Sequence, residues 1–148
     1  MDAGPLYAAY DRDDAEHRTC RRLLENHAGP AIVPILVIAE VAYLLATRVG
    51  LQTEVRFLGD LAAGEFTTEH VDAGDWLRMA ELVVAYGDLP LGTVDASIVA
   101  AAERLNIGVI ATLDRRHFSV VRPAHIDNFD LLPNVRAAVP KTAALRLD

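Results

Sequence analysis

One segment, residues 92–118, constrains the fold of this chain more than any other. It reads GTVDASIVAAAERLNIGVIATLDRRHF. Its first part has the spacing of a short amphipathic helix with Asp95 in the first turn, and a turn at 106–108 leads into an apolar strand over 109–113. Asp114 stands where that strand should end. A helix followed directly by a buried strand is half of a βαβ unit, so the segment predicts a parallel sheet with two carboxylates near one edge.

The rest of the chain also alternates between helical and strand patterns. Helices are expected over residues 15–26, 34–49, 53–63 and 72–86, strands over 31–33, 66–71 and 128–132, and a short helix or turn over 115–121. Strands that alternate with helices predict an α/β fold of three layers, α/β/α, with a mainly parallel central sheet. We expect one domain over residues 1–133 and a C-terminal tail over 134–148, which has no clear period.

Three local patterns refine these elements. Residues 3–5, Ala-Gly-Pro, are typical of a turn. Asp13 followed by Glu16 resembles a capping box at the start of a helix. The helix over 72–86 is expected to bury one apolar side, which is made of Trp76, Leu77, Ala80, Val83 and Val84.

Composition excludes several classes of protein. Of the 148 residues, 52% are apolar and 24% are charged, so the chain can bury the core of a folded domain. A single cysteine, Cys20, excludes an internal disulfide framework and a cysteine-based zinc site, and it suits a reducing compartment. The N-terminus has no signal-peptide pattern, and Pro30 and Pro34 interrupt the most apolar stretch, residues 28–47. We therefore expect a cytoplasmic protein that does not enter a membrane.

The net charge limits the ways in which the chain can bind nucleic acid. It is −7 at pH 7, whereas general binding of DNA or RNA needs a basic face. We therefore expect no DNA binding by this chain alone. The charge remains compatible with an enzyme that holds phosphates through a metal ion.

Glu40 is the most informative single residue. In a helix, its neighbours three and four residues away are Leu36, Val37, Tyr43 and Leu44, all of which are apolar. A lone ionised glutamate buried on such a face costs several kcal/mol, roughly, even after relaxation. Glu40 must therefore be paired with a cation, be protonated, or lie at the lip of a cleft. A structural pairing with a nearby arginine or tyrosine and a functional role are both open from the pattern alone.

Three aspartates are further candidates, each with a structural alternative. Asp95 shares a helix face with Ile98 and Val99 and points inward, although an acid in a first helical turn is often only structural. Asp114 ends a strand, where ligands of open α/β sheets gather, but it can equally cap the next segment. Asp2 is either part of the same site or a disordered terminal residue.

The order of these motifs resembles that of a known family. DAGPLYAAYDRDD, IAEVAYLLATRVG, LGTVDASIVAAAERL and IATLDRRHF are similar to the successive motifs of the PIN-domain nucleases, and specifically to the VapC-type toxins of bacterial toxin–antitoxin systems. The resemblance covers roughly the first 130 residues. It implies a PIN-like fold and a metal-dependent endoribonuclease that hydrolyses RNA phosphodiester bonds.

The resemblance also implies the residues of the site. The acidic quartet of the family falls on Asp2, Glu40, Asp95 and Asp114, with Thr112 as a supporting hydroxyl. Four clustered carboxylates repel one another and need divalent cations or protons, and oxygen ligands favour Mg²⁺ or Mn²⁺. The three aspartates are implied as direct metal ligands. Glu40 is implied to bind through water or to orient the attacking water, and Thr112 to hold a ligand carboxylate.

The chain departs from the family at its N-terminus. In the family, a short apolar strand precedes the first aspartate, but here only Met1 stands before Asp2. The first strand is therefore expected to be shortened or missing, with Asp2 poorly anchored. Arg115, Arg116 and His117 follow the last aspartate and are candidate contacts for RNA phosphates, although solvated charges or helix-end partners are the plainer interpretation of each.

Partners follow from the same resemblance. VapC-type toxins are neutralised by a cognate antitoxin, and an acidic cleft suits a basic antitoxin segment. A homodimer is expected as well, with the helices around 34–63 as candidate surfaces. Two other functions remain open: a Mg²⁺-dependent phosphatase-like phosphoryl-transfer enzyme, and a non-catalytic PIN-like module that binds other proteins.

Overall fold

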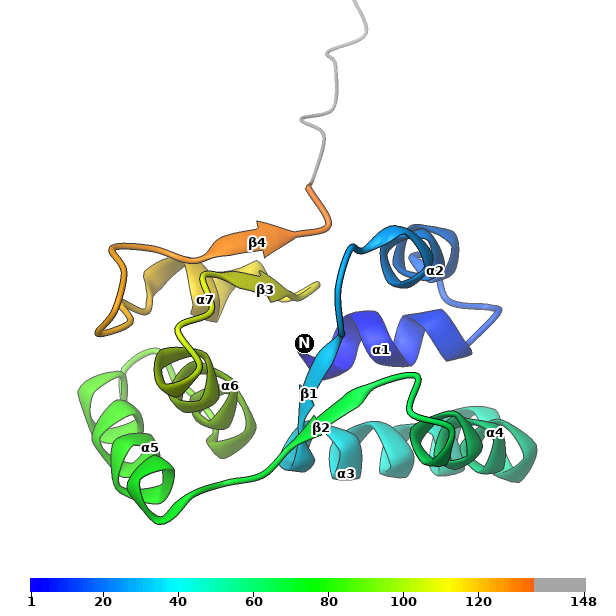
Figure 1. The fold of residues 1–148 in the computed structure, drawn as a ribbon, viewed down its shortest axis with the longest axis horizontal. Coiled ribbons are helices and arrows are strands. Elements are labelled where there is room, and N and C mark those ends of the chain that lie inside the picture. The colour runs from blue at the N-terminus through cyan, green and yellow to red at the C-terminus, as the bar shows by residue number, and fades with distance from the viewer. Residues whose placement is uncertain (135–148) are drawn as a thin grey trace, which may run out of the picture.

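Four short parallel strands form the centre of the structure, which is a computed structural model that describes residues 1–134 (Figure 1). They are β1 (Ile32–Pro34), β2 (Thr67–Glu69), β3 (Val109–Ala111) and β4 (Asp130–Leu132). β1 pairs with β2 so that Ile32 lies opposite Thr67, and β3 pairs with β4 so that Val109 lies opposite Asp130. Both pairs are parallel, which confirms the prediction from residues 92–118. The expected tail lies almost wholly outside the described residues, which include only its first member, Asn134.

Helices surround both strand pairs. They are α1 (Ala3–Tyr10), α2 (His17–Asn26), α3 (Ile35–Leu44), α4 (Leu51–Ala62), α5 (Ala73–Ala85), α6 (Thr93–Arg104) and α7 (Arg115–Val120), with a π-helical turn, η1 (Leu45–Val49), after α3. Figure 1 shows α1 to α4 gathered around β1 and β2, and α5 to α7 gathered around β3 and β4. None of the helices in residues 1–134 is long and apolar enough to cross a membrane.

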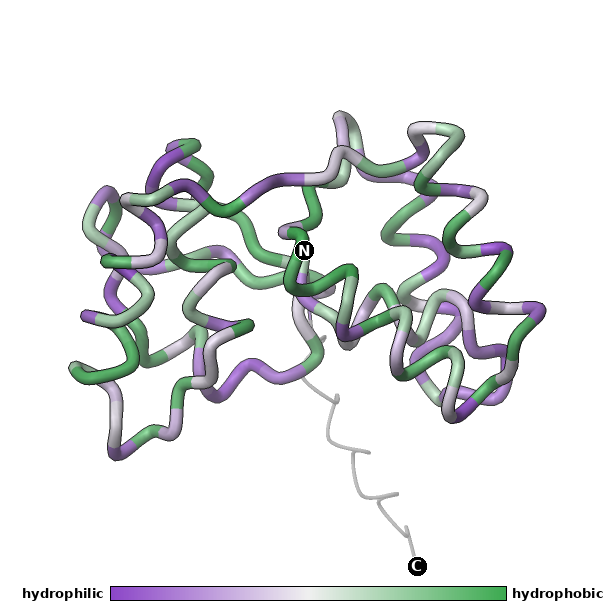
Figure 2. The backbone as a smooth tube through the Cα atoms, turned by 90° about the horizontal axis from the view of Figure 1, so that it is seen from below, coloured by the Kyte–Doolittle hydropathy of each residue, from purple (hydrophilic) through white to green (hydrophobic). Residues whose placement is uncertain are grey.

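The first two residues join the two strand pairs. The amino group of Met1 donates a hydrogen bond to the carbonyl of Ile32 over 2.8 Å, and the N–H of Asp2 donates to the carbonyl of Ala111 over 2.9 Å. The N-terminus therefore lies between the two halves of the molecule, as both views show (Figures 1 and 2). These two residues take the position of a strand between β1 and β3.

The N-terminal region differs from two sequence-based expectations. Residues 3–5 form the first turn of α1 rather than a loop turn, because Asp2 caps this helix and a proline in a first turn loses no hydrogen bond. The capping box expected at Asp13 and Glu16 is wrong. Instead, Asp14 Oδ1 accepts a hydrogen bond from the N–H of Glu16, and α2 begins one residue later, at His17.

Helix α6 lies deepest in the fold. Every residue from Ala96 to Ala102 is buried, including Ile98 and Val99. Four of these seven residues are alanine, and short side chains let other elements approach the helix closely. Because α6 is fixed by packing on all sides, Asp95 in its first turn has little freedom to move.

Helix α5 is turned differently from the prediction. Asp75, Met79 and Leu82 are buried, whereas Trp76, Leu77 and Val84 have exposed fractions of 51%, 72% and 82%. The expected apolar inner side, Trp76, Leu77, Ala80, Val83 and Val84, is in fact the exposed side.

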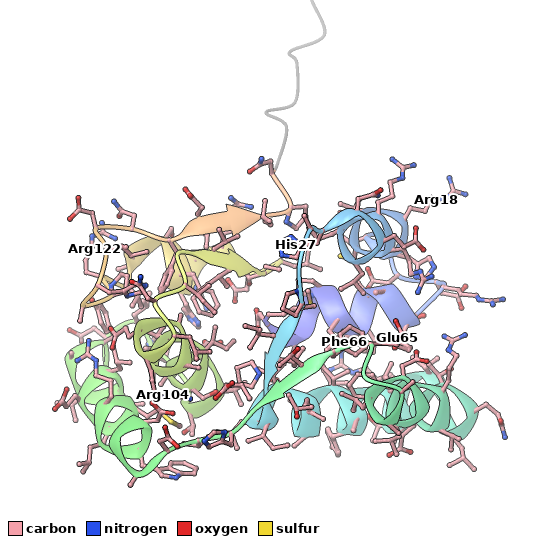
Figure 3. All side chains as sticks on the ribbon, viewed as in Figure 1. Arg18, His27, Glu65, Phe66, Arg104 and Arg122 are labelled. Carbon is pink, nitrogen blue, oxygen red and sulfur yellow. The ribbon has the colours of Figure 1, made fainter. Side chains whose placement is uncertain are left out.

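Two arginines account for this orientation. Arg78 of α5 donates two hydrogen bonds to Glu103 of α6, over 2.8 and 3.0 Å. Arg104 of α6 pairs with Asp75 over 3.0 Å and with Glu69 over 2.9 Å, and Figure 3 shows it at the edge of α6. Charge-assisted hydrogen bonds of this kind are stronger than neutral ones, so α5 presents its charged side to α6.

The carboxylate of Glu103 should make the fold sensitive to acid. Burial raises its pKa, but hydrogen bonds from Arg78 and from the N–H of Ala124 lower it by more, so the net pKa lies below the ordinary value of 4.5. A lowered folded-state pKa means that the stabilisation is present above about pH 4.5 and is lost as the pH falls through the folded-state value. We expect Glu103→Gln to lower the free energy of unfolding by about 1 kcal/mol at pH 7 and by less at pH 3.5.

Urea unfolding followed by circular dichroism at the two pH values measures this difference. Glu81→Gln is the matched control, because Glu81 also pairs with Arg78 but is exposed, and its loss should change stability little at either pH. An equal loss of stability at pH 7 and pH 3.5 for Glu103→Gln would contradict the assignment.

Candidate active site

Asp2 is the buried member of the acidic group, with an exposed fraction of 8%. Its Oδ1 accepts a hydrogen bond from the N–H of Ala3 over 2.6 Å, and its Oδ2 accepts one from the hydroxyl of Thr112 over 2.7 Å. Burial raises the pKa of Asp2, the two hydrogen bonds oppose that rise, and the negative charge of Asp95 adds to it. Asp2 is therefore ordered and anchored, unlike the disordered terminal residue that was one alternative.

Thr112 holds this carboxylate from the end of β3. The residue is 1% exposed, and its hydroxyl also lies 3.0 Å from the backbone carbonyl of Asp114. Because a hydroxyl carries one proton, it donates to only one of these two oxygens at a time. Thr112 thus connects the backbone next to Asp114 with the side chain of Asp2.

Glu40 lies on α3 at the lip of the site. The residue is exposed, and within residues 1–134 its carboxylate has no ion-pair or hydrogen-bond partner. Partial desolvation of the carboxyl end raises its pKa, and the charges of Asp2 and Asp95 raise it further. Of the situations open to this glutamate, the structure excludes pairing with a cation among residues 1–134, and it leaves the residue exposed to solvent near Asp2 and Asp95. The face around it is open rather than wholly apolar and buried, because Tyr43 is 68% exposed.

Asp95 extends from the first turn of α6 and contacts a histidine. Its Oδ2 lies 2.6 Å from Nδ1 of His117, and the two side chains are 22% and 12% exposed. Sequence reasoning did not anticipate this pair. The available signal was the place of His117 in the helix that follows Asp114, because α7 carries it back towards α6.

Asp114 stands apart from the other three carboxylates. It is exposed and caps α7, where its Oδ1 accepts a hydrogen bond from the N–H of Arg116 over 3.1 Å. The charge of Asp95 raises the pKa of Asp2, and the charges of Asp2 and Asp95 raise that of Glu40, but Asp114 is not among the causes of either shift. Among the residues that the structure describes, no three His, Cys, Asp or Glu side chains lie close enough together to ligate one ion.

The basic residues after Asp114 differ in their surroundings. Arg115 donates hydrogen bonds to the carbonyls of Pro133 over 2.8 Å and Leu131 over 3.1 Å, so it ties α7 to the strand β4. Arg116 is exposed, and its Nη2 lies 3.3 Å from Nε2 of His117. Arg116 is therefore the better candidate for a phosphate contact, because its side chain faces solvent beside the carboxylates.

The donor set of this site fits a hard divalent cation. Asp2, Glu40 and Asp95 offer only carboxylate oxygens, which suit such ions better than they suit zinc or copper. Burial is the main cause of the raised pKa values of Asp2 and Glu40, and the negative charges of neighbouring carboxylates raise both values further. A bound cation would relieve this repulsion, which gives a physical reason for the three acids to lie near one another.

Comparison with known proteins relates the chain to one family. The PIN domain matches residues 1–122 of the chain. Ribonuclease VapC26 of Mycobacterium tuberculosis is 35% identical over 133 residues, which cover 90% of this chain and 98% of that protein. The crystal structure of Mycobacterium tuberculosis VapC20, described as a sarcin-ricin loop cleaving toxin, superposes with a TM-score of 0.69 at 24% identity, covering 73% of this chain and 83% of that one. The match to the VapC20 structure supports the fold alone.

The contact between Thr112 and Asp2 can be tested without any substrate. Thr112→Val keeps the side-chain volume but removes the hydroxyl, so Asp2 should lose its fixed orientation. We expect the affinity for Mn²⁺ to fall by about tenfold or more, as is typical when a group that orients a metal ligand is removed. Electron paramagnetic resonance of free Mn²⁺ during titration measures this affinity, with the exposed Thr68→Val as the matched control. Unchanged Mn²⁺ binding by a folded Thr112→Val variant would show that the contact serves only the fold.

Proposed function

The chain belongs to the PIN-domain family, and from that premise we propose that it is a metal-dependent endoribonuclease that acts as the toxin of a toxin–antitoxin pair. One observation carries the proposal. The N-terminal Asp2, Glu40 of α3 and Asp95 of α6 come from distant parts of the sequence, yet they lie near one another: besides burial, the charge of Asp95 raises the pKa of Asp2, and the charges of Asp2 and Asp95 raise the pKa of Glu40. Like charges held near one another are costly unless a cation binds them. The similarity to Ribonuclease VapC26 supports RNA hydrolysis as the reaction.

Each residue has a distinct role in the proposed reaction. Asp2, Asp95 and Asp114 would hold Mg²⁺ or Mn²⁺, and Asp114 would have to leave its cap position to do so. When bound, the cation supplies an activated water and neutralises charge on the scissile phosphate. Glu40, with its raised pKa, orients the attacking water and accepts its proton. Thr112 fixes Asp2, and His117 fixes Asp95 through its contact with Oδ2.

The substrate is RNA, held by its backbone. Arg116 supplies a positive charge beside the acidic group, which suits a phosphate next to the one that is cleaved. Arg115 has a structural role in this proposal, because its guanidinium is already bonded to the carbonyls of β4 and its neighbour Pro133. The single cysteine, which is buried and unpaired, fits action in the reducing cytoplasm.

Two protein partners belong to the same proposal. The carboxylates of Asp2, Glu40 and Asp95 and the net charge of −7 favour a basic antitoxin segment that lies across the site. A homodimer would cover the apolar face of α3 and α4, on which Tyr43, Leu51 and Val55 are 68%, 66% and 53% exposed. An exposed apolar surface of this kind is typical of an interface between proteins.

The proposed reaction can be tested on the purified protein freed of any antitoxin. It is incubated with total RNA, and separately with a phosphate monoester, in Mn²⁺ or in EDTA. We expect RNA cleavage in Mn²⁺ only, and at least a hundredfold loss of rate in Asp95→Asn and Asp114→Asn, because both variants remove a charged metal ligand. Asp88→Asn is the matched control, since Asp88 is exposed and has no role in the proposed site, and it should keep full activity.

The other outcomes separate the alternatives. Hydrolysis of the ester without cleavage of RNA would favour a phosphatase-like enzyme. Absence of both activities, while a protein partner still binds tightly, would favour a non-catalytic module. Full RNA cleavage by Asp114→Asn alone would remove Asp114 from the metal site and leave the other residues in place.

A further inference from the structure

One face of α1 is open to solvent beside the acidic group. The residues of α1 are buried except Gly4 and Tyr7, which are partly exposed and lie three positions apart on one side of the helix. Gly4 adjoins Leu113, because a Cβ atom added to this glycine would lie 3.4 Å from the Cβ atom of Leu113. Leu113 stands between Thr112 and Asp114. The open face of α1 therefore begins beside the candidate active site and leads to Tyr7.

A π-helical turn brings Arg48 to Tyr7. In a regular α-helix, Arg48 would lie eight residues beyond Glu40 and about 80° away from it around the axis. The turn η1 departs from this geometry, since the N–H of Gly50 donates to the carbonyl of Leu45, five residues earlier, over 2.8 Å. A π-turn advances less per residue, so Arg48 returns towards the face that carries Glu40. Single π-turns of this kind are frequent at functional sites.

Arg48 and Tyr7 form a pair that is open to solvent. The guanidinium carbon of Arg48 lies 6.0 Å from the centroid of the Tyr7 ring, within the range of a cation–π contact. The ring is held in place, since the Tyr7 hydroxyl donates a hydrogen bond to Oδ2 of Asp11 over 2.7 Å. Arg48 is exposed, and its guanidinium has no hydrogen-bond or ion-pair partner within residues 1–134. Its N–H groups are therefore available to a ligand.

We propose that Arg48, held over Tyr7, binds a phosphate of the RNA backbone other than the one that is cleaved. The inference rests on the proposed function, in which the acidic group holds the cleaved phosphate through a metal ion. Eight residues of helix, at 1.5 Å each, place Arg48 about 12 Å from Glu40 along the axis. Arg48 therefore contacts a neighbouring phosphate of the same strand.

The chemistry of the pair suits a phosphate group. A guanidinium has five N–H donors and no acceptor, stays charged, and matches two phosphate oxygens at once. Tyr7 restrains the arginine before the RNA arrives, which lowers the entropy cost of binding. Together with Arg116 of α7, Arg48 gives the strand backbone contacts from two separate elements. Contacts to phosphate carry no sequence information, so the subsite should hold RNA of any base sequence.

RNA binding tests the subsite without cleavage. The full chain carries Glu40→Gln, which keeps the three proposed metal ligands, and it is titrated in Mn²⁺ into a fluorescein-labelled dodecamer of uridine at several NaCl concentrations. The signal is fluorescence polarisation. We expect Arg48→Ala to weaken binding about threefold or more and to make the dependence of log K on log salt shallower by about 0.7, the value for one phosphate contact to a single strand. A dodecamer of adenosine should respond in the same way.

Matched variants separate a phosphate contact from a structural role. Arg18→Ala removes an exposed arginine on the outer side of α2, as Figure 3 shows, and should leave both affinity and salt slope unchanged. Arg48→Lys keeps the charge and should retain the slope. Tyr7→Leu removes the ring and should weaken binding about two- to fivefold with the slope retained. The proposal is overturned if Arg48→Ala leaves the slope unchanged, or if Arg48→Lys is as weak and as insensitive to salt as Arg48→Ala.

Cleavage by the protein with Glu40 intact distinguishes the subsite from the proposed function. We expect Arg48→Ala to raise KM for RNA about threefold or more with little change in kcat, because the contact holds substrate and transition state equally. Unchanged KM in Arg48→Ala, while Asp95→Asn abolishes cleavage, would overturn the subsite and leave the proposed function standing. Absence of cleavage, with RNA binding that still depends on Arg48, would overturn the proposed function alone. Absence of any RNA binding would overturn both.

Discussion

The hydrogen bond from the N–H of Asp2 to the carbonyl of Ala111 is the constraint on which the arrangement of the site depends. It fixes the N-terminus against β3, while the amino group of Met1 fixes it against β1. These two bonds hold the side-chain carboxylate of Asp2 in a buried position beside Thr112. Without them, one of the two charges that add to the effect of burial on the pKa of Glu40 would be absent from the site.

Two of the candidate site carboxylates are held firmly by neighbouring side chains, and a third caps a helix. Asp95 is fixed by the buried helix α6 and by His117, and Asp2 by Thr112. The side chain of Asp114 instead caps α7. A cap of this kind contributes about 1 kcal/mol, which is small beside the gain that ligation of a divalent ion would bring in the proposed function.

Much of this could be predicted from sequence, and the failures have physical causes. The spacing of residues 92–118 predicted α6, β3 and their parallel setting, because local periodicity decides those elements. The orientation of α5 could not be predicted in this way. Its apolar residues outnumber its charged ones, but Arg78 and Asp75 pair with partners that lie far along the chain, and those pairs decide which side is buried. The contact of His117 with Asp95 also depends on how α7 packs, which no local pattern encodes.

The orientation of α5 has a consequence for optical studies of this protein. Trp76 is the only tryptophan in the sequence, and it is half exposed on the outer side of α5. Its emission should therefore already resemble that of a solvated indole in the folded protein. Tryptophan fluorescence would report on events at the outer surface of α5, such as the arrival of a second protein, far more than on the state of the core or of the carboxylates.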